Sequence, residues 1–240
     1  MAAKSQNPIA DLISLPIQPN FNFGLGPHDR TQSLVNVQPV IPIGLGDDFN
    51  LVTRVIMPLI NQPDLRQSSG ATFGLGDFNP TFFLVPKMPG NLMVGFGPTF
   101  LLPTATDRVL GNGKWGIGPS AVVVWSPAPW VLGALVNNIW SFAGDSQRKN
   151  VDRMTFQPFV NYNLPGGWYL STGPIITADW TARSGDRWTV PVGGGVGKIW
   201  RIGHQPVNTS VQAYYNVVKP QTVNGPDWQL RLQWTFLFPK

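Results

Sequence analysis

Strict alternation between apolar and polar side chains is the feature of this sequence that most constrains its fold. In residues 228–238 the apolar face holds Trp228, Leu230, Leu232, Trp234, Phe236 and Phe238, and the polar face holds Gln229, Arg231, Gln233 and Thr235. Residues 32–43 repeat the pattern, with Val35, Val37, Pro39, Ile41 and Ile43 opposite Gln32, Asn36 and Gln38. A period of two with one wholly apolar face indicates a β-strand that is buried on one side.

Twelve segments of this kind follow one another along the chain, separated by turn-forming residues. They cover residues 13–24, 31–45, 49–63, 71–87, 92–106, 114–126, 130–143, 152–164, 168–182, 187–201, 206–219 and 228–238. The connections alternate between tight turns, such as 46–48 and 165–167, and longer loops that carry most of the charge, such as 64–70 and 144–150. An even number of strands with short turns at one end and longer loops at the other is typical of a membrane β-barrel.

We therefore predict an all-β protein, a transmembrane antiparallel β-barrel of about 12 strands with short periplasmic turns and longer extracellular loops. In lipid every backbone group must be paired internally, so the sheet has to close. Residues 13–240 form the barrel as a single domain, and residues 1–12 form a periplasmic N-terminal segment. This segment contains NPIADLISL, which is either a short helix before the first strand or a small plug. A soluble barrel with its apolar face inward gives the same alternation and is the alternative at the level of the fold.

Tryptophan spacing separates a membrane barrel from a soluble one. Four segments carry two tryptophans each, on one face: Trp115 and Trp125, Trp130 and Trp140, Trp168 and Trp180, and Trp188 and Trp200. At about 3.3 Å per residue and a tilt of about 40°, each pair spans a rise of about 25–30 Å, which matches the apolar band between the aromatic girdles of a membrane barrel. We expect these residues at the lipid interfaces; ordinary core tryptophans are the alternative. Asn138 fits least well, because it falls on the tryptophan face.

Proline occurs within many of these segments, as in FNPTFFL at residues 78–84. Six prolines share an outward parity and a similar height above the tight turns: Pro39, Pro80, Pro98, Pro119, Pro158 and Pro174. Because proline has no N–H, the carbonyl of the partner strand loses its donor. We predict a belt of prolines at mid-height on the lipid face, several of them at β-bulges or local bends.

Composition excludes several kinds of site. The chain has no cysteine and two histidines, His28 in a longer loop and His204 in a tight turn. A barrel phospholipase needs a Ser–His pair near the lipid-facing wall, and neither histidine is placed for that role. We expect no enzyme activity, no metal and no cofactor. The net charge of +5 is too small to indicate nucleic-acid binding, and no apolar stretch reaches the ~18 residues of a transmembrane helix.

The inward parity predicts a lumen lined mainly by neutral amides. The lining residues are Gln38, Arg54, Asp77, Asn79, Gln157, Asn161, Asp179, Gln212, Arg231 and Gln233. In a narrow polar conduit the charged members would set the local field. In the alternative, these groups hydrogen-bond across the lumen and fill it. Eight strands leave room only for side chains and sixteen leave a channel, so a barrel of about twelve allows both.

Basic residues gather in the longer loops. The predicted outer rim includes Arg148, Lys149, Arg153, Arg183 and Arg187. Arginine pairs well with phosphate, so this rim suits the phosphates of lipopolysaccharide. A solvated charged rim explains the same residues.

A group of stretches spans nearly the whole chain: GPHDRTQ, TFGLGDFNPTFFL, GPTFLLPTATD, GKWGIGPS, GALVNNIWSFAGD, QPFVNYNLPGGWYL, GDRWTVPVGGGVGKI and QAYYNVVKP. These stretches resemble a family of bacterial outer-membrane proteins whose members are often labelled transporter-like or, misleadingly, neuromedin U. The resemblance implies a barrel in the outer membrane of a Gram-negative bacterium, related in style to barrels linked with uptake of aromatic compounds. It implies no established substrate and no catalytic residues.

The two ends of the chain bear on export and assembly. MAAKSQNP lacks the apolar region of a secretory signal, so an export signal is not visible here. LQWTFLFPK looks like the final strand that the barrel-assembly machinery recognises, although it ends in Pro239-Lys240 and not in an aromatic residue.

The predicted function is a narrow, porin-like channel for passive or weakly selective passage of small solutes. The first alternative is a structural or surface-interaction barrel with a filled lumen. The second is an uptake route for hydrophobic or aromatic compounds. The expected partners are outer-membrane lipids, lipopolysaccharide at the outer rim and the barrel-assembly machinery, while the solute stays unidentified.

Overall fold

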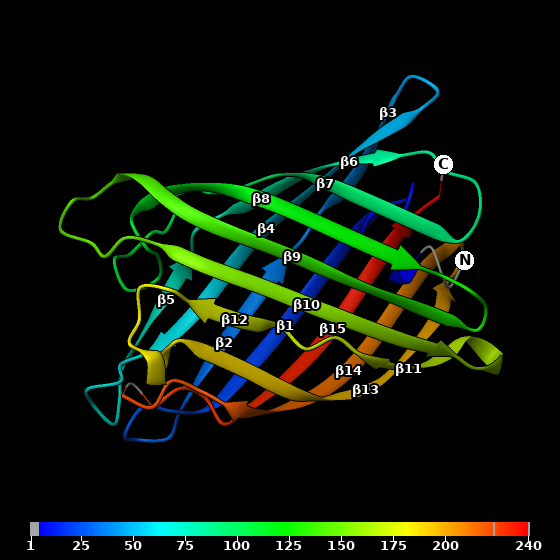
Figure 1. The fold of residues 1–240 in the computed structure, drawn as a ribbon. Helices are drawn as coiled ribbons and strands as arrows, with labels where there is room; N and C mark the ends of the chain where they lie inside the picture. The colour runs from blue at the N-terminus through cyan, green and yellow to red at the C-terminus, as the bar shows by residue number, and fades with distance from the viewer. Residues whose placement is uncertain (1–4, 223, 240) are drawn as a thin grey trace.

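The computed structural model describes residues 5–222 and 224–239, which form one closed antiparallel β-barrel (Figure 1). Its fifteen strands are β1 (Ile13–Leu25), β2 (Arg30–Val37), β3 (Val40–Leu45), β4 (Phe49–Pro63), β5 (Ala71–Leu75), β6 (Asn79–Pro86), β7 (Leu92–Leu101), β8 (Lys114–Trp125), β9 (Trp130–Gly144), β10 (Asp152–Asn163), β11 (Trp168–Thr172), β12 (Ile176–Asp179), β13 (Trp188–Ile202), β14 (Gln205–Val218) and β15 (Trp228–Phe238). Except for three pairs that continue one another, strands adjacent in sequence are adjacent in the sheet, and the pairing of β15 with β1 closes it.

Three pairs of strands, β2 with β3, β5 with β6 and β11 with β12, are each one strand of the barrel interrupted near its middle. β3 and β2 both pair with β1 and β4, and β11 and β12 both pair with β10 and β13. Counted in this way the barrel has twelve strands. The predicted fold class, an all-β antiparallel barrel of about twelve strands, is confirmed.

Proline accounts for two of these interruptions directly. Pro39 lies between β2 and β3, and Pro174 lies between β11 and β12. Pro80 is the second residue of β6 and follows the third interruption. The predicted bends do not extend to the other prolines, since Pro98, Pro119 and Pro158 lie inside the continuous strands β7, β8 and β10 (Figure 1).

The interruption between β5 and β6 is a bulge that holds one extra residue. Leu75 lies opposite Leu59, whereas Asn79 lies opposite Ile56, so four steps along one strand match three along the other. The extra residue reverses the parity of β5 relative to β6. Phe73 therefore faces outward and is 72% exposed.

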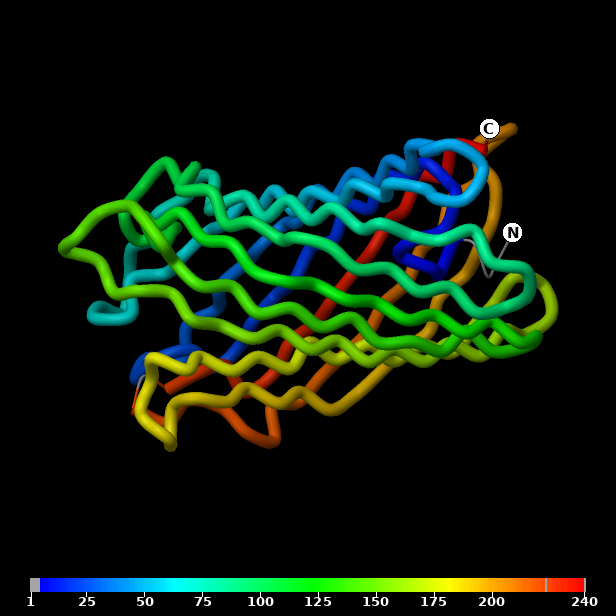
Figure 2. Tube along the Cα trace, turned by 45° about the horizontal axis from the view of Figure 1, so that its top comes forward, coloured from blue at the N-terminus to red at the C-terminus, as the bar shows by residue number. Residues whose placement is uncertain are grey.

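The two ends of the barrel differ as predicted. Tight connections such as 46–48 and 126–129 lie at one end, here called the turn end, with both chain termini (Figure 2). Longer connections such as 102–113 and 145–151 lie at the other, here called the loop end. Among the described residues, no helix is long and apolar enough to cross a membrane.

All ten tryptophans lie on the outer surface, with exposed fractions of 36–52%. Trp115, Trp140, Trp180, Trp188 and Trp228 lie near the loop end of their strands, and Trp125, Trp130, Trp168, Trp200 and Trp234 lie nearer the turn end. The alternative of ordinary core tryptophans is therefore wrong. Asn138 is a polar residue on this outer face, and both polar atoms of its side chain are hydrogen-bonded. Its oxygen accepts from Trp180 Nε1 at 2.8 Å, and its nitrogen donates to Asp152 at 2.9 Å.

Candidate functional site

The lumen at the turn end is filled by apolar side chains. Inward-facing residues of the wall, Val40, Val52, Phe83, Val85, Val122, Val124, Val131 and Leu135, form one buried cluster. Ile9 from the N-terminal segment is part of this cluster and is only 1% exposed. The expectation of a lumen lined mainly by amides is therefore wrong at this end, where both faces of the wall are apolar.

The N-terminal segment, residues 5–12, lies inside the turn end of the barrel. Ala10 and Leu12 pack with Leu237 of β15 in a second buried cluster. Gln6 donates to Asn163 Oδ1 at 2.9 Å. Of the two options that the sequence left open for this segment, the described part corresponds to a small plug. Residues 1–4 of the predicted 1–12 segment lie outside the described residues.

Arg231 is the centre of a hydrogen-bonded layer at mid-height in the lumen. Its guanidinium donates to Asn20 Oδ1 at 3.3 Å, Gly173 O at 2.8 Å, Gln212 Oε1 at 3.4 Å and Gln229 Oε1 at 3.0 Å. The guanidinium carbon also lies 4.9 Å from the centre of the Tyr214 ring. Arg231 is 2% exposed, so every part of this cation is in contact with protein.

This layer completes the hydrogen bonding of the strand break before Pro174. Arg231 donates to the Gly173 carbonyl, and the Gly173 N–H donates to the Tyr214 hydroxyl at 2.9 Å. The same hydroxyl donates to Gln212 at 3.1 Å. Lumen side chains thus replace the ladder partners that the interruption removes from the backbone.

An inward-facing glycine of β13, Gly197, makes room for the first of two tyrosines that cross the lumen in opposite directions. A Cβ at Gly197 would lie 2.1 Å from the Tyr169 ring. Tyr169 reaches from β11 across this strand and donates to Asn208 Oδ1 of β14 at 2.6 Å. Tyr214 reaches in the opposite direction, from β14 to Gly173. Strand crowding, one of the explanations expected for this glycine, is what the structure shows.

Arg54 stands at the start of a chain of amides on the opposite wall. Its Nη2 donates to Gln38 Oε1 at 2.7 Å, Gln38 donates to Gln18 at 3.3 Å, Gln18 donates to Gln233 at 2.8 Å, and Gln233 donates to Thr235 at 2.9 Å. Each amide turns its oxygen toward Arg54, so the amide dipoles stabilise the positive charge. Among the described residues only Gln38 forms a hydrogen bond with Arg54.

A second amide chain starts at Arg231. From Gln229 it continues to Asn22 at 3.0 Å, to Gln32 at 2.8 Å and to Gln62 at 2.5 Å. Both chains begin at an arginine and end without a carboxylate. Within the described residues, the hydrogen-bond acceptors of the two lumen arginines are neutral amides and one backbone carbonyl.

A cavity of about 170 Å³ lies between the amide chain of Arg54, Arg231 and the N-terminal segment. Arg54 and Arg231 both line it, as do Gln18, Gln38, Gln157, Asn161, Ser171, Gln212 and Gln233. Val40, Leu135 and Phe159 form an apolar part of its wall. Seven of the ten predicted lining residues thus meet at one cavity: Gln38, Arg54, Gln157, Asn161, Gln212, Arg231 and Gln233. Their functional role stays a prediction.

The other three predicted lining residues lie elsewhere. Asn79 is on the inner face of β6, where its side-chain nitrogen donates to Thr99 at 3.0 Å. Asp77 lies in the bulge, and its carboxylate accepts hydrogen bonds from the backbone N–H groups of Asn112 and Ala105. Asp179 ends β12 and caps its own turn through Thr181. Both carboxylates organise loop-end backbone, so Asp77 and Asp179 do not line the cavity of the two arginines, and their effect on the field of the lumen stays a prediction.

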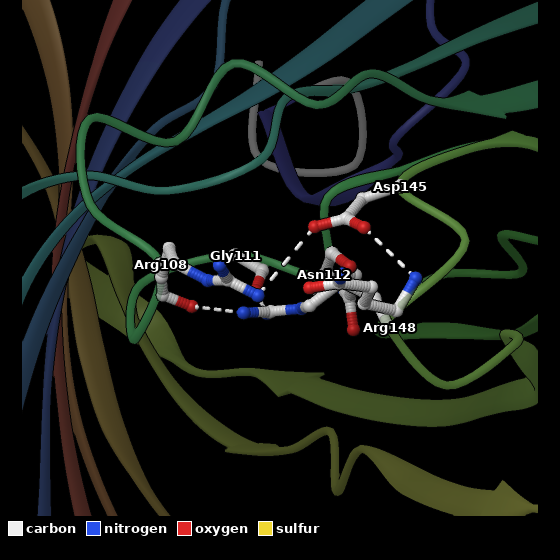
Figure 3. A network of polar contacts seen from close by, with 6 residues as sticks. Arg108, Gly111, Asn112, Asp145 and Arg148 are labelled. Carbon is white, nitrogen blue, oxygen red and sulfur yellow. Dashed lines mark hydrogen bonds and ion pairs between the residues drawn. The ribbon is translucent and has the colours of Figure 1, made fainter.

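Arg148 holds the loop at 102–113 in place. Figure 3 shows its side chain among Arg108, Gly111, Asn112 and Asp145. It donates to the carbonyls of Arg108 at 2.8 Å, Asn112 at 3.2 Å and Gly111. Arg108 also lies 3.5 Å from the Asp145 carboxylate. Arg148 therefore does not act as a free cation of the outer rim.

The remaining rim residues have different surroundings. Lys149, Arg153 and Arg183 are exposed. Arg153 lies opposite Asp179 in the register and has the inward parity of Gln157, so it is at the mouth of the lumen. Arg187 is partly buried, 5.6 Å from the centre of the Trp180 ring.

Several residues of this site were not anticipated. Gln18, Asn20, Tyr169 and Tyr214 all carry part of the lumen network. Alternation in residues 13–24 and 206–219 would have found Gln18, Asn20 and Tyr214. Ile9 had no such signal, because it lies outside the alternating segments.

No protein-family model and no curated protein sequence matches this chain. Among solved structures, the chain is similar to an outer membrane channel from Pseudomonas putida F1, with a TM-score of 0.70 and 18% identity over 95% of this chain and 94% of that chain. It is also similar to the β domain of the Bordetella autotransporter Brka, with a TM-score of 0.51 and 11% identity over 95% and 100% of the two chains. Its likeness to outer membrane phospholipase A from Escherichia coli is weaker, with a TM-score of 0.45 and 13% identity over 94% and 96% of the two chains.

At these identities the likeness shows the fold alone, which is that of an outer-membrane β-barrel. The transporter-like family indicated by the sequence stretches stays a prediction.

Proposed function

We propose that this protein resides in the outer membrane of a Gram-negative bacterium and that its lumen is a narrow, gated passage for small solutes. The observation that carries the proposal is the way the lumen is closed. A polar cavity with two arginines lies directly above a seal that includes a separate segment of the chain, residues 5–12. A segment that precedes the first strand moves without breaking the pairing of the barrel wall.

Opening such a seal exposes two large apolar side chains of the segment, Ile9 in the large cluster and Leu12 in the second cluster. Burying one isoleucine side chain contributes about 1.5–3 kcal/mol. Ile9 is the member of the large apolar cluster that comes from the segment. Displacement of the segment exposes this side chain and the wall residues around it, and leaves the twelve-stranded ladder intact.

The filled, structural barrel is the alternative that the central layer favours. The four hydrogen bonds donated by Arg231 stabilise a closed lumen.

Uptake of hydrophobic compounds is the second alternative. It is favoured by an apolar groove of about 770 Å³ on the outer wall, where Pro98 and Pro119 lie opposite each other. A hydrophobic fluorescent probe taken up into cells only when the barrel is expressed would support that route.

Lipid partners follow from the surface of the barrel. The two rings of tryptophans fit the interfaces of a bilayer. Lys149 and Arg183 are exposed at the loop end and are available to lipopolysaccharide phosphates. Recognition of the last strand by the barrel-assembly machinery is part of the same proposal.

The proposal also includes the absence of enzyme activity. It is supported by the places of His28 and His204, which lie in connections at opposite ends of the barrel.

Single-channel recording in planar bilayers tests the passage. We expect rare, short openings from the unaltered protein and frequent openings from Ile9→Asp, because a carboxylate cannot stay in an apolar cluster. Ile9→Val is the matched control, since it removes one methyl group and keeps the seal apolar. Silence from all three folded proteins would eliminate the passage and leave the filled barrel.

A further inference from the structure

We propose that the cavity between Arg54 and Arg231 is a binding site for a small organic carboxylate. The inference rests on the proposed passage and deepens it, because it names the class of solute that the lumen selects. Three observations support it: the positive charges of the lumen, the hydrogen bonding of Arg54 and the residues that line the cavity.

Among the described residues, neither Arg54 nor Arg231 forms an ion pair with an aspartate. Every acidic residue of the chain is an aspartate. In the described part of the chain the ion pairs, Arg108 with Asp145 and Lys219 with Asp227, lie in the loop-end connections. Asp77 and Asp179 bond to loop-end backbone and not to either lumen arginine. Ionisable residues in a membrane interior are costly and are retained where they serve a site, so an anion is the missing partner.

Arg54 has the free donors that such an anion needs. A guanidinium offers five N–H donors in a fork that matches a carboxylate. Within residues 5–222 and 224–239, one of these donors is used, toward Gln38. The rest of the group faces the cavity. Arg231 differs, since its bonds to Asn20, Gly173, Gln212 and Gln229 leave it to act through its charge.

The lining explains why the anion is small and organic. Gln157, Ser171 and Ser210 present amide and hydroxyl groups to the cavity, and Leu135 and Phe159, which lie beside Gln157 in the wall, present apolar surface. A cavity of about 170 Å³ is close in size to the engineered 150 Å³ cavity that holds benzene. A carboxylate head against Arg54 with a short carbon body against Phe159 uses both kinds of wall.

Binding is measured by calorimetry on the folded protein in detergent, with sodium butyrate as probe and butyramide as its neutral isostere. We expect saturable binding of butyrate and at least tenfold weaker binding of butyramide. Inorganic phosphate and chloride are the competing anions. If either binds as tightly as butyrate, the site is a general anion site and the carboxylate assignment is overturned.

Three variants locate the site. Arg54→Gln is expected to weaken butyrate binding at least tenfold, and Arg54→Lys to weaken it less, because lysine keeps the charge but not the fork. Arg153→Gln removes the same charge at the mouth of the lumen and is the control, with an expected change under threefold. Equal losses from Arg54→Gln and Arg153→Gln would overturn the site in favour of a general field. Heat modifiability on gels confirms that each variant is folded, and Arg54→Lys serves as the test if Arg54→Gln does not fold.

Conductance separates this inference from the proposed passage. If butyrate binds and depends on Arg54 while Ile9→Asp shows no openings, the site stands and the passage fails. If Ile9→Asp opens but butyrate does not bind the unaltered protein, the passage stands and the site is overturned.

Discussion

Arg54 and Arg231 are two inward-facing arginines of one lumen, and their surroundings differ. Arg231 donates to four acceptors, covers the Tyr214 ring and is almost completely buried. Arg54 donates to Gln38 and otherwise faces a cavity. The same residue type therefore serves two purposes. One arginine completes the wall at a strand break, and the other is left available for a ligand.

The largest effect is expected from Arg231→Met. This change leaves Asn20, Gln229 and the Gly173 carbonyl without the donor that they share, while Gln212 keeps its bond from Tyr214. Each unpaired buried acceptor costs about 1–3 kcal/mol, so we expect the free energy of unfolding to fall by about 3 kcal/mol or more. Urea unfolding in phospholipid vesicles, followed by the interfacial tryptophans, measures it. A loss as small as that from the exposed control Arg183→Met would contradict the structural role of Arg231.

Tyr214→Phe tests the same layer with a smaller change. Phenylalanine keeps the ring beside Arg231 and removes the hydroxyl that accepts from the Gly173 N–H and donates to Gln212. We expect a loss of about 1–2 kcal/mol, because a backbone N–H beside Pro174 loses its partner. Tyr162→Phe, on the outer face against Trp130, is the matched control and should be neutral. The idea that side chains complete the strand break fails if both variants behave alike.

Arg54→Met should change stability by less than about 1 kcal/mol in either direction. It removes one hydrogen bond to Gln38 and, at the same time, a cation that has no acid partner. The unfolding midpoint in the same vesicles gives the result. A loss as large as that of Arg231→Met would show that both arginines are structural and would remove the contrast between them.

The smallest effect concerns a charge outside the membrane. Hydrogen bonds from the Thr222 side chain and backbone, then from the Gln221 backbone, together with nearby Arg183, lower the pKa of Asp186 from its usual 3.8. Because the folded-state pKa lies below the unfolded value, the ionised carboxylate holds the two loops together above pH 3.8, and this contribution is lost as the pH falls through the folded pKa. We expect the protection of the Gln221 and Thr222 amides, measured against their intrinsic exchange rates, to fall as the pH drops below 3.8.

Asp186→Asn serves as the control for that measurement. It should show low protection at both amides, with little dependence of that protection on pH in this range. Equal pH dependence in the two proteins would mean that another group titrates.

Much of the wall could be predicted from sequence. Alternation placed Arg54, Arg231 and the amides Gln38, Gln212 and Gln233 on the inner side, because the parity of a strand is a local property. Tryptophan spacing placed both interfaces for the same reason.

The filled turn end was missed, although a signal existed. Val122, Val123 and Val124 form a continuous apolar run at the turn end of β8, and Phe82 and Phe83 do the same in β6. Runs of this kind indicate a strand that is buried on both faces. Asp77 was misplaced for another reason, since one extra residue in the bulge reverses parity and nothing local fixes its position.

The sequence alone determined that the chain is built of strands with one apolar face and, outside the bulge, which side chains face inward, because a period of two acts within each strand. Tertiary structure decided which inward groups meet. Arg231 reaches Gly173, 58 residues away, only because the register of β15, the closure of the barrel and the break before Pro174 bring them together. The difference between a satisfied arginine and an available one is a property of these long-range pairings, which no single strand encodes.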